Sequence, residues 1–105
     1  MDIQIKKGLL DVCVLRALTK EESYGYKIIQ DLAPYVDISE STLYPVLKRL
    51  ESAAHVTTWT KEQNGRLRRY YMITQAGTDH LMDFRKNSHS ILKIIDYITN
   101  GGLRA

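Results

Sequence analysis

The sequence predicts a mainly α-helical fold with a small β hairpin and a long C-terminal helix. Three observations predict it. Apolar side chains recur at helical spacing through residues 8–50, residues 55–74 are rich in β-branched and aromatic side chains, and another helical pattern fills residues 75–100. The chain has 105 residues, of which 44% are hydrophobic, so it has room for one domain with a real core.

The composition excludes several classes of protein. Charged residues make up 26% of the chain and the hydrophobic fraction is ordinary, which is typical of globular chains. No apolar run approaches the roughly 20 residues that span a bilayer, so we expect no contact with a membrane. The N-terminus shows no signal-peptide pattern, and the single cysteine, Cys13, lies in an apolar run. Together these features favour a reduced, cytoplasmic protein.

Two helices are expected in the first third of the chain. Residues 8–18 are apolar around most of their helical circumference, which predicts a buried helix. Residues 24–33 carry apolar side chains at helical spacing, with Ser23 as the expected N-cap and Pro34 ending the run. A glycine inside a helix costs roughly 1 kcal/mol relative to alanine, so we expect Gly25 to permit close helix packing.

A third helix is expected to begin between residues 40 and 42, with Ser39 or Ser41 as its N-cap. This start keeps Pro45 close to the first turn, where its missing N–H costs less. The expected buried stripe is Leu43, Val46, Leu47 and Leu50. Hydroxyl and basic side chains on the opposite face are those that recognition helices use on DNA, although a plain solvated face would look the same. These candidate DNA-binding residues are Ser41, Thr42, Tyr44, Lys48 and Arg49.

A β hairpin is expected from residues 55–61 and 66–74, because the Asn64-Gly65 pair between them is a strong turn signal. Residues 61–70 carry an excess of three positive charges, which equals the formal net charge of the whole chain, +3. Arg66 and Arg68 beside the turn are placed to reach phosphates or the minor groove. On charge alone, a solvated hairpin remains the alternative.

Three helices followed by a basic hairpin have the order of a winged helix-turn-helix. We therefore expect residues 1–74 to form a DNA-binding domain of this kind, and residues 75–105 to form a dimerisation helix with a short tail. Thr74 is the expected N-cap of that helix, and Gly101-Gly102 the expected end.

The expected C-terminal helix carries a seam with alternating spacings of four and three residues, typical of coiled coils. The seam residues are Gly77, Leu81, Phe84, Ser88, Ile91, Ile95 and Ile98. A seam without a partner inside the chain predicts a second copy as partner, although the helix could instead fold back on its own domain. The expected dimer interface is Leu81, Phe84, Ile91, Ile95 and Ile98.

The middle of this seam, residues 87–90, is polar where a coiled coil would prefer leucine or isoleucine. One interpretation is a polar layer that fixes the register of two helices. The other is a small cavity for an aromatic acid or phenol, lined by Asn87, Ser88 and Ile91 with Phe84 as its apolar wall.

The sequence gives no support for an enzyme, a metal site or a cofactor. His55, His80 and His89 lack metal-ligand spacing with other histidines or cysteines. Cys13 lies in expected core, which argues against a nucleophile. No glycine-rich phosphate loop and no serine elbow is present.

Three motifs resemble those of the PadR-like family of transcriptional regulators. Residues 41–51, STLYPVLKRLE, are similar to the family's recognition-helix signature T-L-Y-P-x-L-x-R-L-E. Tyr24-Gly25-Tyr26 resembles its Y-G-Y, and residues 65–77, GRLRRYYMITQAG, resemble its wing pattern. The motifs cover most of residues 8–77 in the family's order, and the single C-terminal helix resembles the smaller subfamily.

The resemblance implies a homodimeric repressor that binds a palindromic operator, and many family members respond to small aromatic compounds. The chain departs from the family where Ala54 and His55 replace the usual glycine, so the left-handed end of the third helix is expected to form differently. Asn87 stands where some drug-binding members carry a tryptophan, and the only tryptophan, Trp59, lies in the expected hairpin.

We therefore expect a sequence-specific repressor whose partners are double-stranded operator DNA, a second copy of itself and, in the ligand hypothesis, a small aromatic effector. The alternative is a winged-helix module that dimerises and binds a protein without reading DNA. Salt dependence of binding to short duplexes separates the two, because phosphate contacts release counterions.

Overall fold

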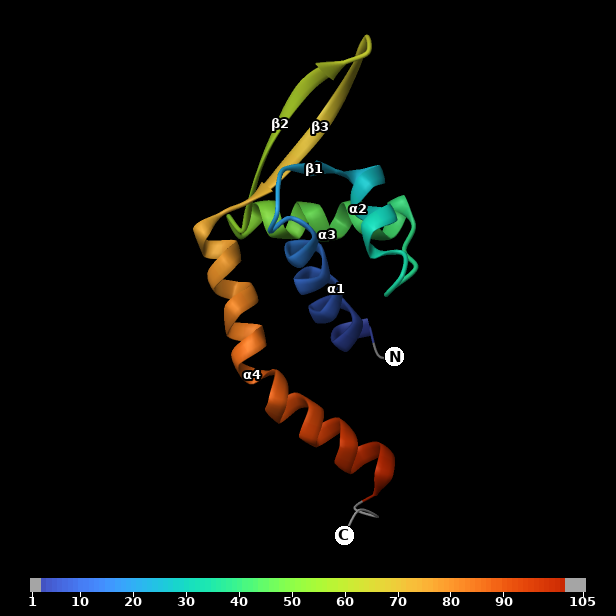
Figure 1. Cartoon of the computed structure of the whole chain (residues 1–105), viewed down its shortest axis with the longest axis vertical. Coiled ribbons are helices and arrows are strands. Elements are labelled where there is room, and N and C mark those ends of the chain that lie inside the picture. Colours follow the sequence, from blue (N-terminus) through green and yellow to red (C-terminus); the bar gives the residue numbers. More distant parts are fainter. Residues whose placement is uncertain (1–2, 102–105) are drawn as a thin grey trace.

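The structure, a computed structural model, describes residues 3–101, with side chains from residue 8 onward. Four helices and three strands follow one another along these residues (Figure 1). In chain order they are α1 (Ile3–Ala17), β1 (Ser23–Tyr24), α2 (Gly25–Leu32), α3 (Glu40–Ser52), β2 (Val56–Gln63), β3 (Arg66–Ile73) and α4 (Gln75–Asn100). This order confirms the expected mainly helical fold with a small β element and a long last helix.

Helices α1, α2 and α3 pack around one shared core. Leu15 of α1, Ile28 of α2 and Leu47 of α3 are each at most 1% exposed. The whole expected stripe of α3 is buried with them. Burial of one such side chain contributes roughly 1.5–3 kcal/mol, so packing and not helix propensity holds the short α2 in place.

The start of α2 differs from the prediction that Ser23 caps this helix. Ser23 and Tyr24 form strand β1, and Tyr24 is the N-cap residue, with extended backbone and no side-chain cap hydrogen bond. The Ser23 prediction is wrong because this serine pairs with Tyr71 of β3, which buries it. A strand of two residues has no alternation that a sequence could reveal.

Helix α3 begins at Glu40, inside the expected range, and Ser39 is its N-cap residue. The Ser39 side chain makes no cap hydrogen bond to the backbone; its Oγ lies 2.9 Å from Ser41 Oγ and 3.2 Å from Thr42 Oγ1. Pro45 lies in the second turn on the exposed side of the helix. Its side chain therefore displaces nothing in the core, and the cost is one missing backbone hydrogen bond.

The C-terminal end of α3 contains a left-handed residue that is not glycine. Ala54 has φ = 61°, and the His55 N–H donates to the Leu50 carbonyl at 2.8 Å, as in a Schellman ending. The expectation that this end forms differently from the glycine version is therefore wrong. The chain keeps the left-handed conformation and accommodates an alanine in it.

Strands β2 and β3 form the expected hairpin, which projects away from the helices (Figure 1). Asn64 and Gly65 have φ values of 53° and 76°, as a two-residue type I′ turn requires. Strand β1 pairs with β3, so the sheet order is β1-β3-β2. We refer to β2, β3 and their turn as the wing. Tyr71 is buried beneath it.

Helix α4 begins and ends where the sequence predicts. Thr74 is its N-cap, with Oγ1 accepting a hydrogen bond from the Gly77 N–H at 3.1 Å, and Gly101 ends it with φ = 55°. A Cβ at Gly77 would lie 2.1 Å from the His55 carbonyl oxygen. That carbonyl accepts from the Thr74 N–H at 3.0 Å, so glycine is needed for α4 to start against the end of α3.

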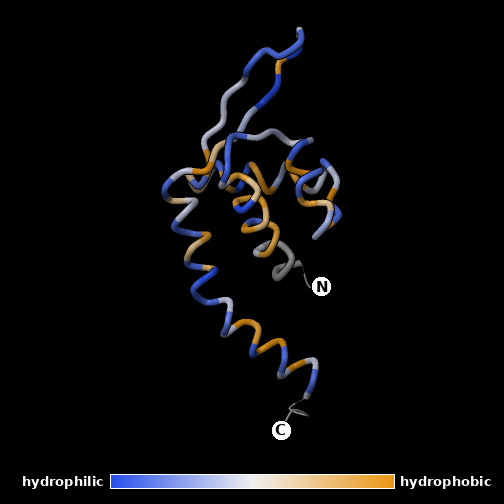
Figure 2. The backbone as a smooth tube through the Cα atoms, in the orientation of Figure 1, coloured by the Kyte–Doolittle hydropathy of each residue, from blue (hydrophilic) through white to orange (hydrophobic). Residues whose placement is uncertain are grey.

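The two halves of α4 have different surroundings. Leu81 belongs to the core of its own chain and Phe84 packs against that core. Residues 91–98, the apolar end of α4, extend away from the domain (Figure 1). Most residues of this part are hydrophobic, unlike those in the middle of the helix (Figure 2). The prediction that the seam has no partner inside the chain is therefore wrong for Leu81 and Phe84, because α1 provides one.

Candidate nucleic-acid interface

The face of α3 opposite the core presents most of the residues expected to contact DNA. Ser41, Tyr44 and Lys48 are exposed there, and Thr42 is half-buried beside them. The hydroxyls of Ser41 and Thr42 both approach Ser39 Oγ, which gathers three hydroxyls at the start of the helix. Such short hydroxyl side chains at a helix N-terminus can reach base edges or phosphates.

Arg49 does not join this face. Its Nη2 lies 2.5 Å from Asp11 Oδ1 of α1, and both side chains are partly buried. The pair holds α3 against α1, so this guanidinium is committed to a structural contact. The sequence could not reveal this, because Asp11 and Arg49 are 38 residues apart.

The wing arginines lie on two faces of the sheet. Arg66 and Arg68 share one face, as the alternation predicts, and Arg66 is exposed. Arg68 is half-buried, with its Cζ 4.0 Å from the centre of the Tyr24 ring. Arg69 points to the other face, where its Nη2 lies 3.7 Å from Glu51 Oε2 of α3. That pair is exposed, so it contributes little to stability.

The exposed face of α3 and the wing belong to one continuous surface. A small hollow of about 210 Å³ lies between the starts of α2 and α3 and strand β3. Tyr44 of α3 and Arg68 of β3 both line it, together with Tyr24 and Tyr26. Sequence reasoning did not select Tyr24 or Tyr26 as site residues; the Y-G-Y motif marked their position without indicating a role.

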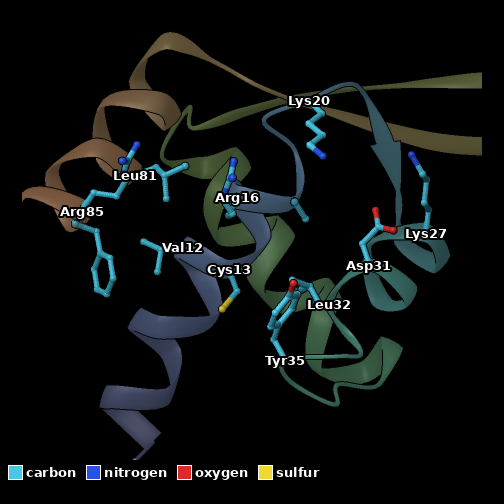
Figure 3. A pocket seen from close by; sticks show the side chains of 12 residues that line it. Val12, Cys13, Arg16, Lys20, Lys27, Asp31, Leu32, Tyr35, Leu81 and Arg85 are labelled. Carbon is cyan, nitrogen blue, oxygen red and sulfur yellow. The ribbon is translucent and has the colours of Figure 1, made fainter. Parts of the chain in front are cut away.

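A larger groove of about 770 Å³ lies between α1, α2 and α4 (Figure 3). Its floor is apolar, with Val12 of α1, Leu32 of α2 and Leu81 of α4. Cationic side chains surround the floor: Arg16, Lys20, Lys27 and Arg85. Lys27 is paired with Glu21 at 2.8 Å.

The apolar end of α4 is exposed. Ile94, Ile95, Tyr97 and Ile98 are between 47% and 71% exposed, and Ile91 is half-buried. Single exposed apolar side chains are ordinary, but a contiguous group on one helix marks an interaction surface.

The residues expected to line an effector cavity do not enclose one within the described chain. Asn87 Nδ2 donates to the Asp83 carbonyl at 2.8 Å, and Ser88 Oγ donates to the Arg85 carbonyl at 2.7 Å. Their polar groups are thus bonded to their own helix, whose axis bends near this point (Figure 1). Phe84 lines the larger groove instead.

The shifted pKa values have structural causes. Burial raises the pKa of the Cys13 thiol, which keeps it protonated and unreactive at neutral pH. Burial also raises the pKa of Tyr71, while the nearby Arg69 opposes the shift. The hydrogen bond from Lys27 lowers the pKa of Glu21. None of these groups is a poised acid, base or nucleophile.

Within residues 3–101, no group of three or more His, Cys, Asp and Glu side chains could hold a metal ion. No helix in the same range is long and apolar enough to cross a membrane.

Comparisons with known proteins identify the family. The model of the Transcriptional regulator PadR-like family matches residues 14–83. Protein X of Lysinibacillus sphaericus is 32% identical over 102 residues, which cover 92% of this chain and 94% of that protein. The crystal structure of smu.1704 from Streptococcus mutans UA159 matches with a TM-score of 0.78 and 39% identity, over 94% of this chain and 93% of that one.

One similar structure contains DNA. It is Bacillus subtilis PadR in complex with operator DNA, with 27% identity and a TM-score of 0.68 over 72% of this chain and 46% of that one. Members of the matched family are transcription regulators and not enzymes. The helical core, the sheet-based wing and the long last helix fit that family, and the family model covers two thirds of the sequence. The chain therefore belongs to the PadR-like family of transcriptional regulators.

Proposed function

We propose that this protein is a homodimeric repressor that binds operator DNA through α3 and the wing. The observation that carries the proposal is the single surface on which Tyr44 of α3 and Arg68 of the wing meet around one hollow. The operator complex of Bacillus subtilis PadR supports it, since that protein shares the fold. In this proposal the protein acts in the cytoplasm, together with the DNA that it reads.

Helix α3 is proposed to enter the major groove. Ser41, Thr42 and Tyr44 then face base edges, while Lys48, one further turn along the same face, reaches a phosphate. Arg66 and Arg68 are proposed to contact the backbone or minor groove beside it. Arg49 is left out of this set because Asp11 already occupies its guanidinium.

A second copy of the chain is proposed to cover the apolar end of α4. Ile91, Ile95 and Ile98 are its contacts, together with Leu81 and Phe84 of the same helix, which line the larger groove. A twofold dimer brings the same patch of both copies together, so the exposed helix and the groove can be buried at once. The two α3 helices then read inverted half-sites about 34 Å apart.

Selection of bound fragments from genomic DNA, followed by footprinting, tests this proposal. We expect two inverted half-sites with centres one helical turn apart, and repression of a reporter gene placed behind them. Protection of a single half-site, or the absence of any enriched sequence, contradicts the proposal. The absence of any enriched sequence would favour the alternative, a protein-interaction module. Among the described residues, only the apolar surfaces support that alternative.

Release by a small aromatic effector remains a prediction about the dimer. Phe84, Asn87, Ser88 and Ile91 can enclose a cavity only if the second copy closes it. Thermal melting with phenolic and planar aromatic compounds tests it. A ligand at 100 times its dissociation constant adds roughly 2.7 kcal/mol to the stability of the native protein. If no compound raises the melting temperature, or if Ser88→Leu responds like the wild type, the site is not there.

A further inference from the structure

The outer face of the sheet carries a stack of aromatic side chains with cationic side chains over two of the rings. Trp59 and Tyr70 are stacked with ring centres 6.2 Å apart, and Tyr24 and Tyr70 form a T-shaped pair with ring centres 5.5 Å apart. Lys61 Nζ lies 4.5 Å above Tyr70, and Arg68 Cζ lies 4.0 Å above Tyr24. Because of this covering, Tyr70 is only 6% exposed although it lies outside the core cluster that contains its neighbour Tyr71.

Tyr24 connects this stack to the helix-turn-helix. Its backbone pairs with Tyr70 in the sheet, and it is also the N-cap residue of α2. The next residue, Gly25, allows Tyr44 of α3 to approach, since a Cβ there would lie 3.2 Å from Tyr44 Oη. One tyrosine therefore lies where the wing, α2 and the start of α3 meet.

The two cations of the stack differ in whether a carboxylate of the chain already pairs with them. Lys61 Nζ is paired with Glu22 Oε1 at 3.1 Å. Arg68 forms no ion pair with any carboxylate among the described residues. Stacking on a ring uses only the flat face of a guanidinium, so the N–H groups in its plane stay available for a phosphate.

We propose that Tyr24 is a positioning residue for DNA binding: its ring holds the Arg68 guanidinium of the wing in place with its donor edge free for a DNA phosphate. This inference rests on the proposed DNA-binding function. A free arginine must be immobilised when it binds, at an entropic cost, whereas the stacked arginine is already ordered. Tyr24 itself makes no contact with DNA.

A double-mutant cycle tests the coupling between the two residues. Tyr24→Leu removes the ring and should weaken operator binding about five-fold, within the range of a cation–π contact. In an Arg68→Ala background the same substitution should change binding less than two-fold. Tyr24→Phe keeps the ring and should bind the operator with wild-type affinity. Arg68→Lys keeps the charge but lacks the planar guanidinium, so its affinity should fall to that of Tyr24→Leu.

Thermal melting of every variant separates positioning from folding. We expect Arg68→Lys to have the melting temperature of the wild type and yet to bind operator DNA more weakly. A purely structural role of Arg68 would not produce this combination. Equal loss in Tyr24→Phe and Tyr24→Leu, or losses that multiply independently in the double variant, overturn the inference. Failure of the wild type to bind any duplex would instead overturn the proposed function, so the two failures are distinguishable.

Discussion

At the residue scale, Ala54 is the residue whose backbone conformation most clearly conflicts with its side chain. A left-handed conformation costs an L-residue roughly 1–2 kcal/mol, and Ala54 adopts φ = 61° to end α3. Ala54→Gly should therefore raise the free energy of unfolding by about 1 kcal/mol, offset in part by the greater freedom of glycine in the unfolded chain. Thermal melting should show a rise of roughly 4 °C.

Ala53→Gly is the matched control for this prediction. Ala53 has φ = −84°, so glycine brings no relief there and should lower the melting temperature slightly. Equal effects of the two substitutions would show that strain at Ala54 is absent.

Gly77 presents the opposite situation, because no side chain fits there. A Cβ would lie 2.1 Å from the His55 carbonyl oxygen, a backbone atom that the Thr74 N–H holds in place. Gly77→Ala should destabilise the protein by about 3 kcal/mol, at the upper end for overpacking. Denaturant unfolding measures the loss, with Ala76→Ser at the exposed neighbouring position as the control. Unchanged stability of Gly77→Ala would contradict the described contact between α3 and α4.

At the element scale, α4 combines a segment that folds its own domain with a segment that is exposed. Ile95 and Ile98 are 47% and 69% exposed, so changing both to lysine should leave the protomer folded. In the proposed dimer the same change buries unpaired charge and should produce monomers at micromolar concentration. Analytical ultracentrifugation together with circular dichroism measures both properties.

Leu81→Ala is the contrasting variant within the same helix. Leu81 is 7% exposed, so its truncation should lower protomer stability by about 2–5 kcal/mol. A double lysine variant that still sediments as a dimer would show that the apolar end of α4 is not the interface.

Periodicity and turn chemistry predicted most elements and few of the contacts between them. The stripe of α3, the Asn64-Gly65 turn and the Thr74 cap are local patterns, so each could be predicted from sequence. Strand β1 could not, because two residues carry no alternation and form a strand only through pairing with β3. The same limit applied to the seam, since repeat spacing does not tell whether Leu81 meets α1 or a second copy.

The candidate site shows the same division. The residue types on the α3 face and in the wing followed from helical spacing and charge. Two contacts could not be predicted in this way. Arg49 pairs with Asp11, 38 residues away, and Arg68 stacks on Tyr24, 44 residues away, so only the folded structure reveals them.

At the scale of the whole molecule, the basic wing and the apolar end of α4 lie at opposite ends (Figure 1). The wing projects from one end of a molecule 61 Å long, and the apolar end of α4 from the other (Figure 1). In a twofold dimer joined through α4, this separation leaves both wings free to meet the same face of a duplex. The distance between the two α3 helices is then set by α4, which lies outside the DNA contact.

The salt dependence of DNA binding tests the central claim most directly. Each phosphate contact adds roughly 0.9 to the slope of log affinity against log salt concentration, so Arg66→Ala should flatten the slope by about one unit. Lys86→Ala, an exposed change on α4, should leave it unchanged. A steep slope that flattens only in the wing variant is the predicted result. A slope that is flat in the wild type, or identical in both variants, would contradict DNA binding through the wing.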